Sequence, residues 1–181
     1  MYILYLSQKM RNIYKLKLSE SIPDEKENQF PLMNWYVKPE IINRKKYILF
    51  LERQNYLIIW AEGVTGKNIG EIFRANLIKV LETAGIPQDK INSLKTHERE
   101  IYFSKTSDRV WIGVSNDVAR CTQGSLYRLH TTPPELKFLI TYSSNTLIYG
   151  GPNYKNPEDE IRKMFGLKPR SGDEWNINLL R

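Results

Sequence analysis

Two apolar runs separated by four polar residues form the clearest pattern in the sequence. Residues 47–51 and 56–60 are rich in β-branched and aromatic side chains, which favour strands, and residues 52–55 between them suit a turn. Neither run alternates with polar residues, so we expect other elements to cover both faces of this hairpin. The hairpin, residues 46–60, is therefore predicted to be the centre of the fold.

Before the hairpin, the pattern predicts a strand, a helix and a second strand. Residues 1–6 form a short apolar run, and residues 8–18 carry apolar positions near the helical period. Residues 19–31 are mostly polar and predict an exposed connection. Residues 35–42 regain strand character, and Pro39 indicates an edge or bulged position for that strand.

After the hairpin, helical periodicity dominates. The strongest helix spans residues 68–84 and is stopped by Gly85 and Pro87. A short helix at 87–94, a strand at 98–105 and a helix that begins near residues 106–108 follow. The strand should place Ile101 and Phe103 on one face and Tyr102 on the other. A second hairpin, 136–142 with 146–149, and a helix from 156 to 166 complete the pattern.

This order of elements predicts an α+β protein with a mostly antiparallel sheet covered by helices. We expect a core domain over residues 1–121. A C-terminal extension over residues 122–181, with the second hairpin, the last helix and a tail, should pack on that core.

Composition narrows the class of protein. The chain has 181 residues, 41% hydrophobic and 26% charged, which is typical of a globular domain. A single cysteine, Cys121, excludes an internal disulfide and a Cys-rich zinc site. The apolar N-terminal run precedes Lys9 and Arg11, which reverses the order of a signal peptide, and no run is long enough to span a membrane. We therefore expect an intracellular, cytoplasmic protein.

The net charge of +7 and pI near 9.4 favour an acidic partner, either nucleic acid or an acidic protein. A solvated basic surface without a partner is the plain alternative.

Residues 61–68 superficially resemble a phosphate-binding loop. Ala61 stands where that motif requires its first glycine, and Asn68 stands where it requires the magnesium-binding Ser or Thr. We interpret the segment as a turn before a helix and predict no bound cofactor.

His97, Glu98 and Glu100 are the candidates for catalysis, because a histidine beside carboxylates suits acid–base chemistry or a metal. A metal would need a third ligand, and His130 is the only other histidine in the sequence. An exposed polar strand end is the favoured interpretation, and we predict no metal site.

Lys105, Thr106, Asp108 and Arg109 stand where a strand gives way to a helix. Two cations at a helix start could hold a phosphate or a carboxylate. The alternative is structural, with Asp108 capping the helix and Arg109 forming a salt bridge.

Cations also interleave with strand aromatics earlier in the chain. Aromatic rings beside cations can stack unpaired bases, although strand aromatics are more often part of a core. The candidate binding residues of this segment are Trp35, Arg44, Lys45, Lys46, Tyr47 and Arg53, with Tyr36, Tyr56 and Trp60 as further rings.

Several of these segments together resemble a known family. They are Gln8-Lys9, Trp35, Asn43-Arg44-Lys45-Lys46, the helix end at Ala84-Gly85-Ile86, and Lys105-Thr106-Ser107-Asp108-Arg109. The pattern is similar to an uncharacterised prokaryotic domain of unknown function, found alone or ahead of plasmid ORF-3-like domains, and covers about residues 1–121. The resemblance implies a fold and a mobile-element context, but no mechanism.

The leading hypothesis is a non-catalytic binding protein of mobile-element or phage type that contacts nucleic acid, or a protein that handles nucleic acid, through a basic surface. A protein-only adaptor or inhibitor of an acidic partner is the first alternative. A small nuclease-like hydrolase or toxin built on His97, Glu98 and Glu100 is the second.

Overall fold

A computed structural model describes residues 1–22, 32–42, 44–96, 100–106, 108–129 and 156–169. The predicted hairpin at 136–149, most of the connection at 19–31 and the C-terminal tail lie outside these residues.

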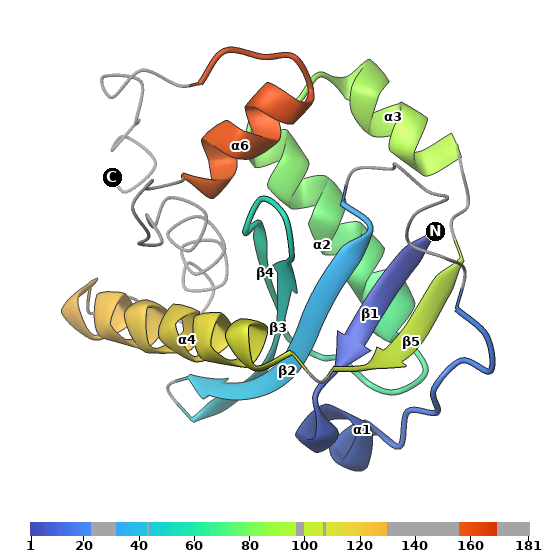
Figure 1. The fold of residues 1–181 in the computed structure, drawn as a ribbon. Helices are drawn as coiled ribbons and strands as arrows, with labels where there is room; N and C mark the ends of the chain where they lie inside the picture. The colour runs from blue at the N-terminus through green and yellow to red at the C-terminus, as the bar shows by residue number, and fades with distance from the viewer. Residues whose placement is uncertain (23–31, 43, 97–99, 107, 130–155, 170–181) are drawn as a thin grey trace.

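A five-stranded mixed sheet forms the centre of the protein (Figure 1), with strand order β4-β3-β2-β1-β5. The first strand runs parallel to both of its neighbours, β2 and β5, whereas β2, β3 and β4 are successively antiparallel. The α+β class is confirmed, but the prediction of a mostly antiparallel sheet is wrong. The strands are β1 (Tyr2–Leu6), β2 (Asn34–Ile42), β3 (Lys45–Glu52), β4 (Ile58–Ala61) and β5 (Ile101–Lys105).

Helices cover both faces of the sheet, as the unbroken apolar runs of the hairpin predict. One core cluster joins the sheet to α2, and a second joins the opposite face to α4. Figure 1 shows α1 at the carboxyl end of β1, with α3 and α6 towards its opposite end. The helices are α1 (Gln8–Tyr14), α2 (Ile69–Thr83), α3 (Gln88–Thr96), α4 (Arg109–Leu129) and α6 (Pro157–Met164).

Phe73 of α2 anchors the first cluster. Its ring centroid lies 5.2 Å from Tyr2, 5.0 Å from Trp35 and 5.2 Å from Phe50, so one helical residue contacts three strands. Edge-on and tilted contacts of this kind are favourable beyond the area they bury. Ile161 of α6, from the predicted C-terminal extension, belongs to the same cluster. The predicted boundary between the core domain and this extension, after residue 121, falls within α4.

The middle strand is β2 rather than the predicted hairpin, which supplies β3 and the edge strand β4. Pro39 is nevertheless at a local edge. The N–H of Ser7 donates to the carbonyl of Val37, so Val37 and, two positions on, Pro39 turn their backbone polar groups towards β1. The pairing of β1 with β2 ends at Val37, so the N–H that proline lacks would have met no strand there.

Helix ends follow local capping chemistry. The α1 helix was predicted to reach residue 18, but it stops at Tyr14 because Lys15 adopts a left-handed conformation with φ 51°. Asn156 caps α6 by accepting from the N–H groups of Glu158 and Asp159, as its sequence predicts.

Asn68 accepts from the N–H of Thr65 at 2.6 Å and donates to the carbonyl of Gly63 at 3.1 Å. The segment that resembles a phosphate loop is therefore a turn closed by its own side chain.

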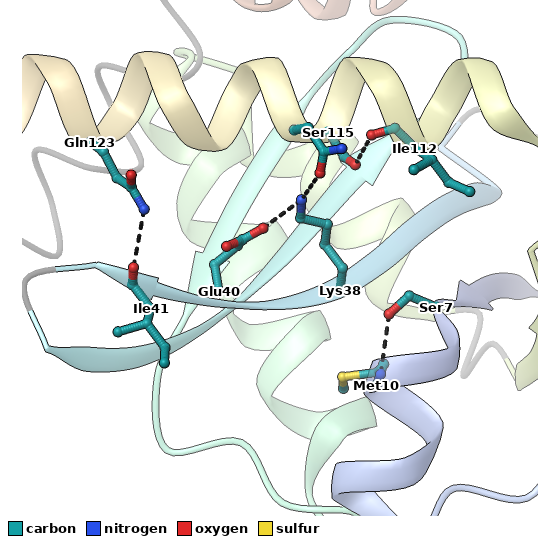
Figure 2. Close-up of polar contacts among 9 residues, drawn as sticks. Ser7, Met10, Lys38, Glu40, Ile41, Ile112, Ser115 and Gln123 are labelled. Carbon is teal, nitrogen blue, oxygen red and sulfur yellow. Dashed lines mark hydrogen bonds and ion pairs between the residues drawn. The ribbon is translucent and has the colours of Figure 1, made fainter.

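Polar contacts fix α4 on β2 (Figure 2). Lys38 is almost fully buried, and its ammonium pairs with Glu40 at 2.5 Å and donates to the side-chain carbonyl of Asn116 at 2.6 Å. Further along, Gln123 donates to the carbonyl of Ile41 at 3.1 Å. Because a buried charge is costly without partners, these contacts set both the position and the direction of the helix.

Replacing Ile58 by alanine tests the packing of the hairpin. Ile58 is fully buried in the α4-side cluster, so Ile58→Ala should lower the unfolding free energy by about 2 to 5 kcal/mol through the cavity it leaves. Ile41→Ala is the matched control, because Ile41 is 57% exposed and its loss should cost no more than about 0.5 kcal/mol. Chemical denaturation of both variants provides the measurement. Equal midpoints for Ile58→Ala and wild type would contradict the assignment.

Candidate functional site

A pocket of about 210 Å³ opens where the sheet, the β3–β4 turn and the start of α4 meet. The side chains come from segments far apart in the sequence, and they combine two cations, three aromatic rings, a hydroxyl and a carboxylate. The lining residues are Tyr5, Tyr36, Arg53, Lys105, Thr106, Asp108 and Trp111.

Arg53 occupies the middle of this arrangement. Its guanidinium carbon lies 4.9 Å from the ring centre of Tyr5 and 5.8 Å from that of Trp111, within the range of cation–π attraction. One of its terminal nitrogens lies 3.4 Å from the Asp108 carboxylate, longer than the roughly 2.7 to 2.9 Å of a strong charged hydrogen bond. Two rings and a loose ion pair therefore hold the guanidinium.

Strand register brings the floor of the pocket together. Tyr5 of β1 pairs with Tyr36 of β2 on one side and with Ser104 of β5 on the other, so Tyr5 and Tyr36 share a face of the sheet. Burial raises the pKa of Tyr36, and its hydroxyl also shares a hydrogen bond with Ser115 of α4. The Tyr36 ring is thus fixed between the sheet and the helix.

The connection from β5 to α4 supplies the other cation. Lys105 ends β5 and is exposed, and the N–H of Thr106 donates to the carbonyl of Leu6 at 3.3 Å. Asp108 then caps α4 by accepting from the N–H of Val110 at 2.9 Å. The structural alternative for Asp108 is therefore confirmed, and its charge partner in the structure is Arg53.

A buried carboxylate shapes the turn that carries Arg53. Glu52 is 1% exposed and accepts from the N–H groups of Gln54 at 2.9 Å and Asn55 at 2.5 Å. Burial raises the pKa of the Glu52 carboxyl, and these hydrogen bonds lower it by less. Glu52 thus fixes the backbone from which Arg53 reaches over Tyr5.

The predicted basic turn lies apart from the pocket. Arg44, with φ 64°, Lys45 and Lys46 are all exposed at the tip of the β2–β3 hairpin. Lys45 begins β3 and Arg53 follows its end, so the two groups are roughly 25 Å apart at about 3.3 Å per strand residue. The predicted cations therefore form two separate groups.

Two predicted stacking residues are part of the core. Trp35 is fully buried, with its indole N–H donating to the carbonyl of Leu32 at 2.7 Å, and Tyr47 is 2% exposed. Neither ring is available to a base in this structure, and the same holds for Trp60. Arg109, at the first position of α4, is exposed and lies outside the pocket lining.

The candidate catalytic residues are only partly described. His97 and Glu98 lie outside the described residues, while Glu100 is exposed and accepts a hydrogen bond from the Tyr102 hydroxyl. Within the described part of the chain, no group of three or more His, Cys, Asp or Glu side chains is placed to hold a metal ion. No helix in that part is long and apolar enough to cross a membrane.

Sequence reasoning named Tyr36 but missed the other two rings that line the pocket, Tyr5 and Trp111. Tyr5 sits inside an apolar strand, and Trp111 lies within the helix predicted to begin near residues 106–108. Both are half-buried, and they contact Arg53 only because β1 lies between β2 and β5. The available signal was the pair of cations, Arg53 and Lys105, each of which follows or ends an apolar strand.

The pH dependence of stability tests the state of Glu52. The folded carboxyl keeps its proton at pH values above its ordinary pKa of 4.5, where the carboxyl of the unfolded chain is already ionised. At these pH values the folded state binds more protons than the unfolded state, so the unfolding free energy should fall as the pH rises above 4.5. Glu52→Gln keeps an oxygen acceptor for the turn but cannot ionise, so it should gain stability relative to wild type between pH 4.5 and 7.5. Urea unfolding of both proteins at both pH values measures this difference. If the stability advantage of Glu52→Gln over wild type shrinks as the pH rises, the pKa of Glu52 is not raised in the folded state.

Comparison with known proteins identifies a family to which no activity is assigned. A search of curated proteins finds no match to the chain. A family model described as Domain of unknown function (DUF6933) matches residues 3–160, which extends beyond the expected similarity over residues 1–121. The match covers most of the sequence, including every residue that lines the pocket. The chain therefore belongs to the DUF6933 family.

Proposed function

We propose that this protein is a non-catalytic binding module that contacts nucleic acid through its basic surface. The observation that carries the proposal is the meeting of Arg53 and Lys105, from separate parts of the chain, in a pocket walled by aromatic rings. Cations attract phosphates irrespective of sequence, and adjacent rings and guanidinium planes are the groups on which unpaired bases stack.

The hairpin tip supplies a second contact region. Arg44, Lys45 and Lys46 are exposed, and the chain carries a net charge of +7. The α4 helix runs between the two groups, because Trp111 lines the pocket and Gln123 contacts Ile41 near the tip. The separation of roughly 25 Å matches about seven phosphates along one strand of a duplex, at about 3.4 Å each. A strand with this phosphate spacing that follows α4 would therefore reach both groups.

Charge reversal at the hairpin tip tests the proposal. The triple variant Arg44→Glu, Lys45→Glu and Lys46→Glu should weaken binding to unrelated sequences alike, because backbone contacts carry no sequence information. For wild type, the logarithm of affinity should fall with that of salt at a slope of about 2 to 4, equivalent to three to five phosphates. The triple variant should flatten this slope. Fluorescence anisotropy with labelled single-stranded and duplex oligonucleotides at several salt concentrations provides the measurement.

A matched control separates local contact from total charge. Reversing the exposed residues Lys67, Lys79 and Lys168 changes the net charge equally, but these residues lie on or near the elements of the α2-side cluster. This control should retain most of the wild-type salt slope. If wild type binds no oligonucleotide at low salt, nucleic acid is excluded and an acidic protein partner becomes the better hypothesis.

A further inference from the structure

We propose that the pocket receives a terminal phosphate monoester of a nucleic-acid strand, an inference that rests on the proposed function. Most polar groups of the lining can donate: the Arg53 guanidinium, the Lys105 ammonium and the hydroxyls of Tyr5 and Thr106. Asp108 is the one carboxylate in the lining. A phosphate monoester carries a charge of about −1.5 to −2 at neutral pH and three acceptor oxygens, so it complements this set.

Arg53 is pre-organised to bind such a group. The rings of Tyr5 and Trp111, at 4.9 and 5.8 Å, restrict the plane of its guanidinium before any ligand arrives. A fixed planar fork can bind two phosphate oxygens at once, with less ordering cost than a free side chain. Asp108 reaches the guanidinium with one oxygen at 3.4 Å and caps α4 with the other, so a phosphate would bind Arg53 beside this carboxylate.

The size and charge of the pocket favour a strand end over an internal phosphate. Its lining brings the rings of Tyr5, Tyr36 and Trp111 together with Arg53 and Asp108. The volume of about 210 Å³ is below the roughly 300 Å³ of the smallest drug-sized sites, so it suits one phosphate with part of its nucleotide. An internal diester needs an exit for chain on both sides and carries one charge, whereas a terminal monoester needs a single exit and matches two cations.

Oligonucleotides that differ only at their ends test the inference. One sequence is prepared with a 5′-phosphate, with a 3′-phosphate and with hydroxyl ends, and affinities are measured by anisotropy at fixed salt. Wild type should bind one phosphorylated form about 10-fold to 100-fold more tightly than the hydroxyl form, the range expected for a charge-assisted contact. Arg53→Lys keeps the charge but removes the fork, and should reduce this ratio to near one. Lys105→Ala changes an exposed side chain and should reduce it in part.

The ratio of affinities for the phosphorylated and hydroxyl oligonucleotides distinguishes binding in the pocket from general affinity for nucleic acid. Lys46→Ala, at the hairpin tip, should weaken all three oligonucleotides and leave the ratio unchanged. Equal, salt-dependent binding of all three by wild type would overturn the inference and leave the proposed function intact. Inorganic phosphate and a nucleoside monophosphate serve as competitors. Binding of the monophosphate without binding of any oligonucleotide would overturn the strand-end assignment together with the proposed function.

Discussion

Strand β1 lies between β2 and β5 and runs parallel to both, so the carboxyl ends of β1 and β5 are aligned beside the middle of β2. Leu6 is consequently opposite Val37 on one side and Lys105 on the other. The chain leaves β5 at this level and enters α4, whose first turns wall the pocket. Without the parallel pairing, Tyr5 would not lie beside Tyr36, and Lys105 would not reach the same pocket as Arg53.

The second requirement is that the Arg53 guanidinium be held in a fixed position against aromatic rings. Glu52 fixes the turn from inside the protein, and Arg53 extends from that turn over Tyr5 and Trp111. Asp108 divides its two oxygens between the cap of α4 and the guanidinium. The Arg53 side chain therefore has a fixed orientation in the pocket wall. Lys38 in the middle of β2 is instead engaged by Glu40 and Asn116 beneath α4.

Elements whose signals are local were predictable from the sequence. The α2 stripe, the β3 and β4 runs, and the Asn156 cap each depend on residues a few positions apart, and each was found near its predicted bounds. The insertion of β1 was not predictable, because parallel neighbours are not joined by a turn with its own residue signature. The composition of the pocket was hard to predict for the same reason. Arg53 and Lys105 were recognised as candidates, but which aromatics face the core and which line the pocket depends on strand register and on the placement of α4.

The central claim is that a terminal phosphate binds in the Arg53 pocket, and NMR tests it most directly. The side-chain resonances of the arginines and aromatic rings are followed during titration with a single-stranded oligonucleotide that carries either a 5′-phosphate or a 3′-phosphate. The structure predicts that Arg53, Tyr5 and Trp111 shift together at one saturating stoichiometry, with the backbone signals of Lys105 and Thr106 among the largest changes. Buried Trp35 and Trp60 should hardly move. Shifts confined to the α2 side of the sheet, or none at the pocket with either oligonucleotide when binding is saturated, would contradict the account.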